Sequence, residues 1–88
     1  MASKEEIQKE IENYLGDANL TKDDFFRNKI KENRDGYVKL EVFLNRNKIK
    51  KMNINTKKIM KACKGSDEVE LNKDGDMVRR KGNKELPE

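Results

Sequence analysis

The chain has 88 residues, of which 43% are charged and 33% hydrophobic, and a net charge of +4. A chain of this length forms one small domain with a modest core, and no stretch is apolar for long enough to span a membrane. The single cysteine, Cys63, excludes an internal disulfide and favours a reducing, intracellular setting, and the absence of histidine excludes an ordinary zinc site and removes the commonest general base.

The first predicted helix covers about residues 4–15. Ser3 and Glu6 have the spacing of a capping box, in which side chains at the helix start satisfy free backbone groups. Apolar residues then recur at helical spacing. Gly16 is expected to end the helix in the left-handed conformation, and residues 17–20 to form a tight connection.

A second helix is predicted to start at Thr21. We expect Thr21 to be its N-cap, with Asp23 and Asp24 favourably placed in the first turn. The helix is expected to end near Asn33, because residues 33–36 have turn chemistry.

The middle of the chain predicts shorter elements. Residues 37–38 are compatible with a very short strand. Leu40, Phe43 and Leu44 have helical spacing and favour a short helix. Residues 45–55 are polar and basic, with a few apolar anchors, and no regular element is assigned to them.

The last third predicts a helix and a hairpin. Asn55 or Thr56 is expected to cap a helix that ends at Gly65. Residues 69–80 predict a β-hairpin that turns at residues 74–75. Periodicity alone therefore supports a small α+β domain.

The positive charge is concentrated in residues 45–64. This block contains eight basic side chains and no acidic one: Arg46, Lys48, Lys50, Lys51, Lys57, Lys58, Lys61 and Lys64. A local field of this kind suits a polyanion such as a nucleic acid. The alternative is a lysine face that serves only solubility.

One stretch carries a family resemblance. Residues 11–26, IENYLGDANLTKDDFF, place an aromatic residue at a helix end, then G-D-x-N-L, then Asp23 and Phe25. This pattern resembles the core of the La motif, the RNA-binding domain of La and La-related proteins. The resemblance continues through residues 36–38 and the closing hairpin.

The resemblance implies a winged-helix domain elaborated with extra helices over residues 1–81. Residues 82–88 would be a flexible tail or linker toward a following RNA-recognition motif. It further implies a monomeric, non-catalytic module without a cofactor or a membrane partner. Nuclear residence, with the cytoplasm as a second location, is also implied by the resemblance alone.

The resemblance also implies a site for RNA 3′ ends that finish in uridines. Tyr14 and Phe25 would stack on the last bases, and Asp23 would accept hydrogen bonds from the terminal ribose hydroxyls. Stacking on one ring contributes about 1–3 kcal/mol, and only RNA has the 2′-hydroxyl. Each residue also has a simpler interpretation, since both rings could pack in the core and Asp23 could serve only the helix dipole.

Three positions depart from the family pattern. Glu10 stands where glutamine is usual, Asn13 where an aromatic residue is usual, and Arg46 near a common phenylalanine. Glu10 would repel phosphate, Asn13 lacks a stacking ring, and Arg46 keeps only a guanidinium plane. We therefore predict weaker and less uridine-selective binding than by a typical La motif.

Lys48, Lys50 and Lys51 are expected to add sequence-independent attraction for phosphates. The competing function is binding of double-stranded DNA, with the lysine-rich helix over residues 57–64 in the major groove. A protein-interaction domain with an incidental charge patch is the third interpretation. An enzyme is the least favoured, because no nucleophile–base pair or metal set is present.

Overall fold

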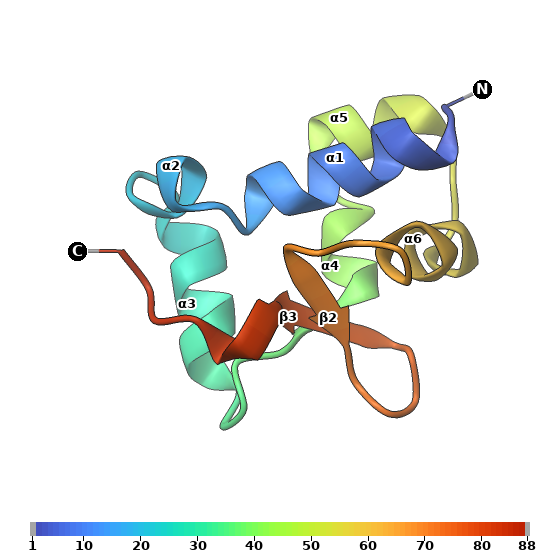
Figure 1. Cartoon of the computed structure of the whole chain (residues 1–88). Helices are drawn as coiled ribbons and strands as arrows, with labels where there is room; N and C mark the ends of the chain where they lie inside the picture. The colour runs from blue at the N-terminus through green and yellow to red at the C-terminus, as the bar shows by residue number, and fades with distance from the viewer. Residues whose placement is uncertain (1, 88) are drawn as a thin grey trace.

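Six helices and a small sheet make up the fold in the computed structural model, which describes residues 2–87 (Figure 1). In chain order the elements are α1 Lys4–Tyr14, α2 Asp17–Leu20, α3 Asp24–Glu32, β1 Val38–Lys39, α4 Leu40–Phe43, α5 Asn47–Met52, α6 Thr56–Cys63, β2 Val69–Leu71 and β3 Met77–Arg80. A short 3-10 turn, η1 Lys81–Asn83, follows β3. The predicted α+β class is confirmed.

The sheet is antiparallel, in the order β1-β3-β2. Val78 of β3 lies opposite Val38 of β1 on one side and Leu71 of β2 on the other. The predicted hairpin is confirmed, and its turn contains Gly75 at a φ of 76°. This positive φ favours glycine. A β-carbon there would also lie 2.9 Å from the Met60 sulfur, so the flexible Met60 side chain would have to move.

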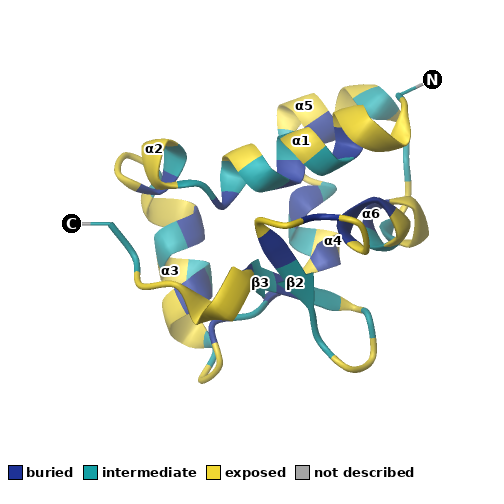
Figure 2. Cartoon of the chain, in the orientation of Figure 1, coloured by how far each residue is buried: buried dark blue, intermediate teal, exposed yellow. Residues whose placement is uncertain are grey.

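The core lies between the helices and the inner face of the sheet (Figure 2). α1 buries Ile7 and Ile11 on the side that packs against α6. α6 buries Ile59, Ala62 and Cys63 in return. Burial raises the pKa of the Cys63 thiol to about 12, so this side chain is a neutral core group.

Three aromatic rings join α1, α3 and α4. The Phe26 ring stacks on Phe43 with a centroid distance of 5.1 Å, and Tyr14 lies 5.2 Å from Phe26 and 6.0 Å from Phe43. Phe26 and Phe43 are fully buried. The cluster therefore fixes the end of α1 and the start of α3 against α4.

Two predictions about helix ends are wrong. Asp23, not Thr21, is the N-cap of α3, because Thr21 still closes α2 and its hydroxyl bonds to the Asp17 carbonyl at 2.7 Å. Gly16 is extended, with φ −81° and ψ 158°, because it caps α2 instead of ending α1 in the left-handed conformation. The predicted tight connection over residues 17–20 is accordingly a single helical turn.

Residues 84–87 return along the body of the domain, and the C-terminal end lies beside α2 and α3 (Figure 1). The Arg27 guanidinium donates to the Pro87 carbonyl at 2.6 Å, and Leu86 packs on the core. Arg80, which is buried, bonds to the Glu85 carbonyl and pairs with Asp17. The role of residues 82–88 as a linker stays a prediction.

The aromatic cluster predicts a contrast between two adjacent phenylalanines. Phe26→Ala should lower the free energy of unfolding by about 3–5 kcal/mol, because it leaves a cavity in the core. Phe25→Ala is the matched control and should cost about 1 kcal/mol, since it removes an exposed ring, its two cation contacts and an edge contact with Phe26, and leaves no core cavity. Urea denaturation measures both values, and equal losses would contradict the assigned burial.

Candidate nucleic-acid interface

A hollow of about 350 Å³ lies where the end of α1, the start of α3 and the segment entering α5 meet. Its lining residues come from three separate parts of the chain: Tyr14, Asp23, Asn45, Arg46, Asn47 and Lys48. Four of the predicted site residues, Tyr14, Asp23, Arg46 and Lys48, thus lie around one space. Phe25, Glu10 and Asn13 do not line it.

Asp23 is fixed by two hydrogen bonds. Its Oδ1 accepts the Phe26 backbone N–H at 3.2 Å, and its Oδ2 accepts the Asn19 side-chain amide at 3.1 Å. Asp23 therefore has a structural role at the start of α3, as its N-cap, in place of the predicted Thr21. A carboxylate offers about four acceptor positions, so capacity remains on both oxygens for hydroxyl donors in the hollow.

Asn19 has a positioning role that sequence reasoning missed. Its amide nitrogen donates to the Tyr14 carbonyl at 2.9 Å as well as to Asp23. One amide has two N–H donors, so it can join the end of α1 to the carboxylate. The asparagine of G-D-x-N-L was the available signal, because its two donors suit a bridge between two chain segments.

Tyr14 is half-buried beneath the hollow, against Phe26 and Phe43. Burial raises the pKa of its phenol above the ordinary value of 10.0, and the Glu10 carboxylate raises it further. The hydroxyl therefore keeps its proton at neutral pH and can donate a hydrogen bond.

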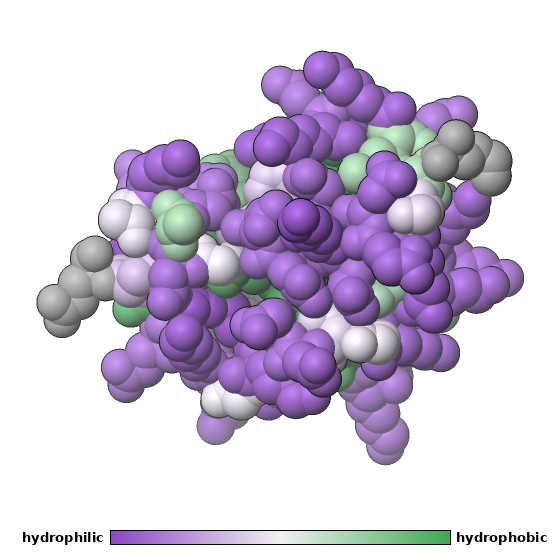
Figure 3. Space-filling view, turned by 45° about the horizontal axis from the view of Figure 1, so that its top comes forward, coloured by the Kyte–Doolittle hydropathy of each residue, from purple (hydrophilic) through white to green (hydrophobic). Residues whose placement is uncertain are grey.

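Phe25 is the one large hydrophobic side chain of residues 2–87 that is exposed, at 39%. The Arg46 guanidinium carbon lies 4.4 Å from its ring centroid and the Lys29 Nζ lies 5.6 Å away. These contacts are in the range of cation–π interactions. The face of the domain drawn in Figure 3 is predominantly hydrophilic.

Arg46 stands near the position where a phenylalanine was expected, and its cationic side chain stacks on the Phe25 ring. Its guanidinium covers part of Phe25, so the two side chains form one unit at the edge of the hollow. The Arg46 Nε is buried and has no hydrogen-bond partner within residues 2–87. Of the other two departures, Glu10 is half-buried near Tyr14 and Asn13 is exposed.

The predicted basic block separates into two surfaces. Lys48, Lys50 and Lys51 are exposed on α5; of these, Lys48 lines the hollow, whereas Lys51 lines a separate depression with Ala2 and Glu6. The lysines of α6 are exposed on the side of that helix opposite its buried residues: Lys57, Lys58 and Lys61. In the described part of the chain, no ion pair joins any of these lysines to an acidic side chain.

Residues 2–87 contain no group of three side chains suited to hold a metal ion. Within the same residues, every helix is too short or too polar to cross a membrane.

Comparison with known proteins gives one family throughout. A family model described as the La domain matches residues 7–65. The mouse La-related protein 7 is 43% identical over 76 residues, which cover 86% of this chain and 13% of that protein. The Drosophila melanogaster La protein homolog is 34% identical over 84 residues, covering 93% of this chain and 22% of that protein.

Solved structures agree with these matches. A La autoantigen N-terminal domain is 34% identical, with a TM-score of 0.88, and covers 96% of this chain and 89% of that chain. The La motif of the Dictyostelium discoideum La protein is 33% identical, with a TM-score of 0.74, and covers 97% and 91% respectively. The predicted winged-helix-like fold is therefore confirmed.

The position of Glu10 predicts a pH effect on Tyr14. Glu10→Gln should lower the pKa of Tyr14 toward 10.0, because a nearby negative charge is removed. Because folding raises the pKa of Tyr14, the neutral phenol stabilises the folded wild-type domain below a pH of about 10, the ordinary pKa. This contribution to the free energy of unfolding is lost as the pH rises through the raised pKa. Absorbance of tyrosinate, with Tyr14→Phe to identify the component, measures the change. Glu5→Gln on the exposed part of α1 is the control, and an equal effect there would contradict the contact.

Proposed function

The chain belongs to the La domain family, a family of RNA-binding domains, and on that premise we propose that it binds RNA 3′ ends in the hollow beside Asp23. One observation carries the proposal: a phenol, a carboxylate and an arginine from three separate segments surround one open space. Terminal nucleotides need such a combination of ring faces, hydroxyl acceptors and cations.

Asp23 would recognise the free terminal ribose. Two vicinal hydroxyls can donate to the acceptor positions that Phe26 and Asn19 leave unused. A DNA end lacks one of these donors, and a 3′-phosphate would be repelled by the carboxylate. Because Asn19 and the helix start hold Asp23 in place, little ordering of this group would be needed on binding.

The rings offer only limited stacking surface to a base. Tyr14 is half-buried and offers part of its ring, and Phe25 is already partly covered by Arg46. A base would therefore stack on the guanidinium plane of Arg46 or compete with it for Phe25. This arrangement supports weaker and less selective binding than two bare rings would give. Glu10 lies outside the hollow but adds a negative charge near Tyr14, and Asn13 supplies no further ring.

Further properties rest on the family alone. A following RNA-recognition motif, nuclear residence and a monomeric state are proposed for the protein on that basis. The 3′-uridine preference and a role in sheltering newly made RNA belong to the same proposal.

Double-stranded DNA binding remains a second candidate, because α6 carries an exposed lysine surface immediately before the hairpin. In that mode α6 would enter the major groove and the hairpin would contact the backbone. The two candidates use different lysines, so charge reversal separates them.

Asp23→Asn should remove discrimination between RNA ends while keeping the fold. Asparagine is as good an N-cap as aspartate, so the helix start survives. A hydrogen bond to a charged group contributes about 1.5–3 kcal/mol, and the preference for a 3′-hydroxyl over a 3′-phosphate should fall about tenfold or more. Fluorescence anisotropy with two oligouridylates that differ only at the 3′ end measures this ratio.

Asp24→Asn provides the matched control, because Asp24 is exposed in the same helical turn and does not line the hollow. An unchanged end preference in Asp23→Asn, or an equal change in Asp24→Asn, would refute the assigned role of Asp23.

Reversing two lysines of α5 should flatten the salt dependence of RNA binding. In the Lys50→Glu, Lys51→Glu double variant, the log–log slope should decrease by at least about 1.4, at about 0.7 per phosphate contact on single strands. Lys57→Glu with Lys61→Glu on α6 is the matched control and should leave the slope for single-stranded RNA nearly unchanged. Strong binding of duplex DNA that only the α6 variant abolishes would favour the second candidate.

A further inference from the structure

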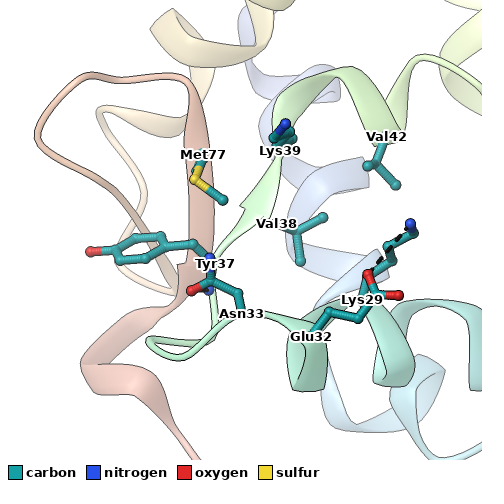
Figure 4. Close-up of a pocket in the computed structure, with 8 residues that line it drawn as sticks. All are labelled: Lys29, Glu32, Asn33, Tyr37, Val38, Lys39, Val42 and Met77. Atoms are coloured by element: carbon teal, nitrogen blue, oxygen red, sulfur yellow. Dashed lines mark hydrogen bonds and ion pairs between the residues drawn. The ribbon is translucent and has the colours of Figure 1, made fainter.

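A second hollow, of about 270 Å³, lies between the last turns of α3, β1 and α4 (Figure 4). Its floor is apolar, with Val38 buried and Val42 and Met77 half-buried. Lys29 and Lys39 stand at its rim. An apolar floor bordered by cations can accept the flat face of a base and the phosphates on either side of it.

Phe25 lies between the two hollows. Arg46 lines the first hollow and packs on the Phe25 ring, and Lys29 lines the second and approaches the same ring. The exposed ring and its two cations therefore form a continuous surface along α3. No acidic side chain is among these three residues.

The separation of the hollows fits a short run of nucleotides. Asp23 and Lys29 are six residues apart along the chain, which corresponds to about 9 Å of helix rise. A stacked strand has one phosphate per about 3.4 Å, so about three nucleotides cover this distance.

We propose that the second hollow binds a base of the same RNA, about three nucleotides upstream of the 3′ end held at Asp23. Lys29 and Lys39 contact the phosphates on either side of this base. The proposal rests on the proposed function, since it uses Asp23 to set the position of the strand. The affinity of the domain would then depend on the length of the single strand as well as on its 3′ terminus.

One carboxylate lies at the rim and has to be accommodated. The Glu32 carboxylate is 3.5 Å from the Lys29 Nζ, with 65% of its side chain exposed. Exposed pairs of this kind contribute little, so Lys29 can exchange Glu32 for a phosphate. Lys39 has no ion pair within residues 2–87 and carries the phosphate contact without such an exchange.

The test compares oligouridylates of three and eight nucleotides, both with a free 3′-hydroxyl. The wild-type domain should bind the longer one about tenfold more tightly, because one more base is seated and further phosphates are contacted. Lys39→Glu should remove most of this gain and lower the log–log salt slope for the longer oligonucleotide by about 0.7. Its affinity for the shorter one should stay within about twofold.

Lys31→Glu is the matched control, since Lys31 is exposed on α3 and lines neither hollow. It should affect both lengths equally. Methyl NMR gives an independent measurement: Val38, Val42 and Met77 signals should shift with the longer oligonucleotide and not with the shorter one.

The outcomes separate the two proposals. If neither oligonucleotide binds, the proposed function fails and this inference with it. If the shorter one binds but length adds no affinity, the second hollow is not a subsite. The subsite is also refuted if Lys39→Glu and Lys31→Glu have the same effect on the affinity for the longer oligonucleotide, or if the three methyl signals do not shift. In either case the proposal of 3′-end binding is unaffected.

Discussion

Packing of Phe26 against Tyr14 and Phe43 determines where the candidate site lies. These rings belong to α3, α1 and α4, and their contacts fix three chain segments that have few other reasons to meet. Because neighbouring helix residues point about 100° apart, burying Phe26 turns Phe25 toward solvent. Core packing and the exposed ring are therefore two results of one constraint.

Asp23 likewise combines a structural contact with a position at the hollow. The carboxylate starts α3, receives the Asn19 amide and still faces the hollow. A group that the fold itself immobilises is suited to recognition, since it loses little freedom when a ligand arrives. Its role as a helix cap therefore does not exclude the proposed role in recognition, although the two compete as explanations when only the sequence is considered.

Local patterns predicted most of the helices, the hairpin and a cap at Asn55 or Thr56, which the structure assigns to Asn55, because these features depend on neighbours in the chain. The start of α3 was misassigned because Thr21 and Asp23 are both good caps, and only the extra turn of α2 decides between them. α5 was missed because six residues show too little apolar periodicity.

The candidate site residues were named from the family resemblance, but their geometry was not predictable. Tyr14, Asp23 and Arg46 meet only after the chain has folded, and no local pattern shows that Arg46 covers Phe25. The second hollow joins α3 to β1 and β3 over a long sequence separation, so it was equally inaccessible to local reasoning.

If RNA occupies the hollow as proposed, the buried Nε of Arg46 would link that occupancy to the stability of the domain. A donor buried without an acceptor costs about 1–3 kcal/mol, and no acceptor from residues 2–87 bonds to this nitrogen. A carbonyl or phosphate oxygen that reached this nitrogen would remove the cost at the moment of association. The position where the family commonly has a phenylalanine would then supply, through Arg46, a hydrogen-bond donor that the ligand satisfies.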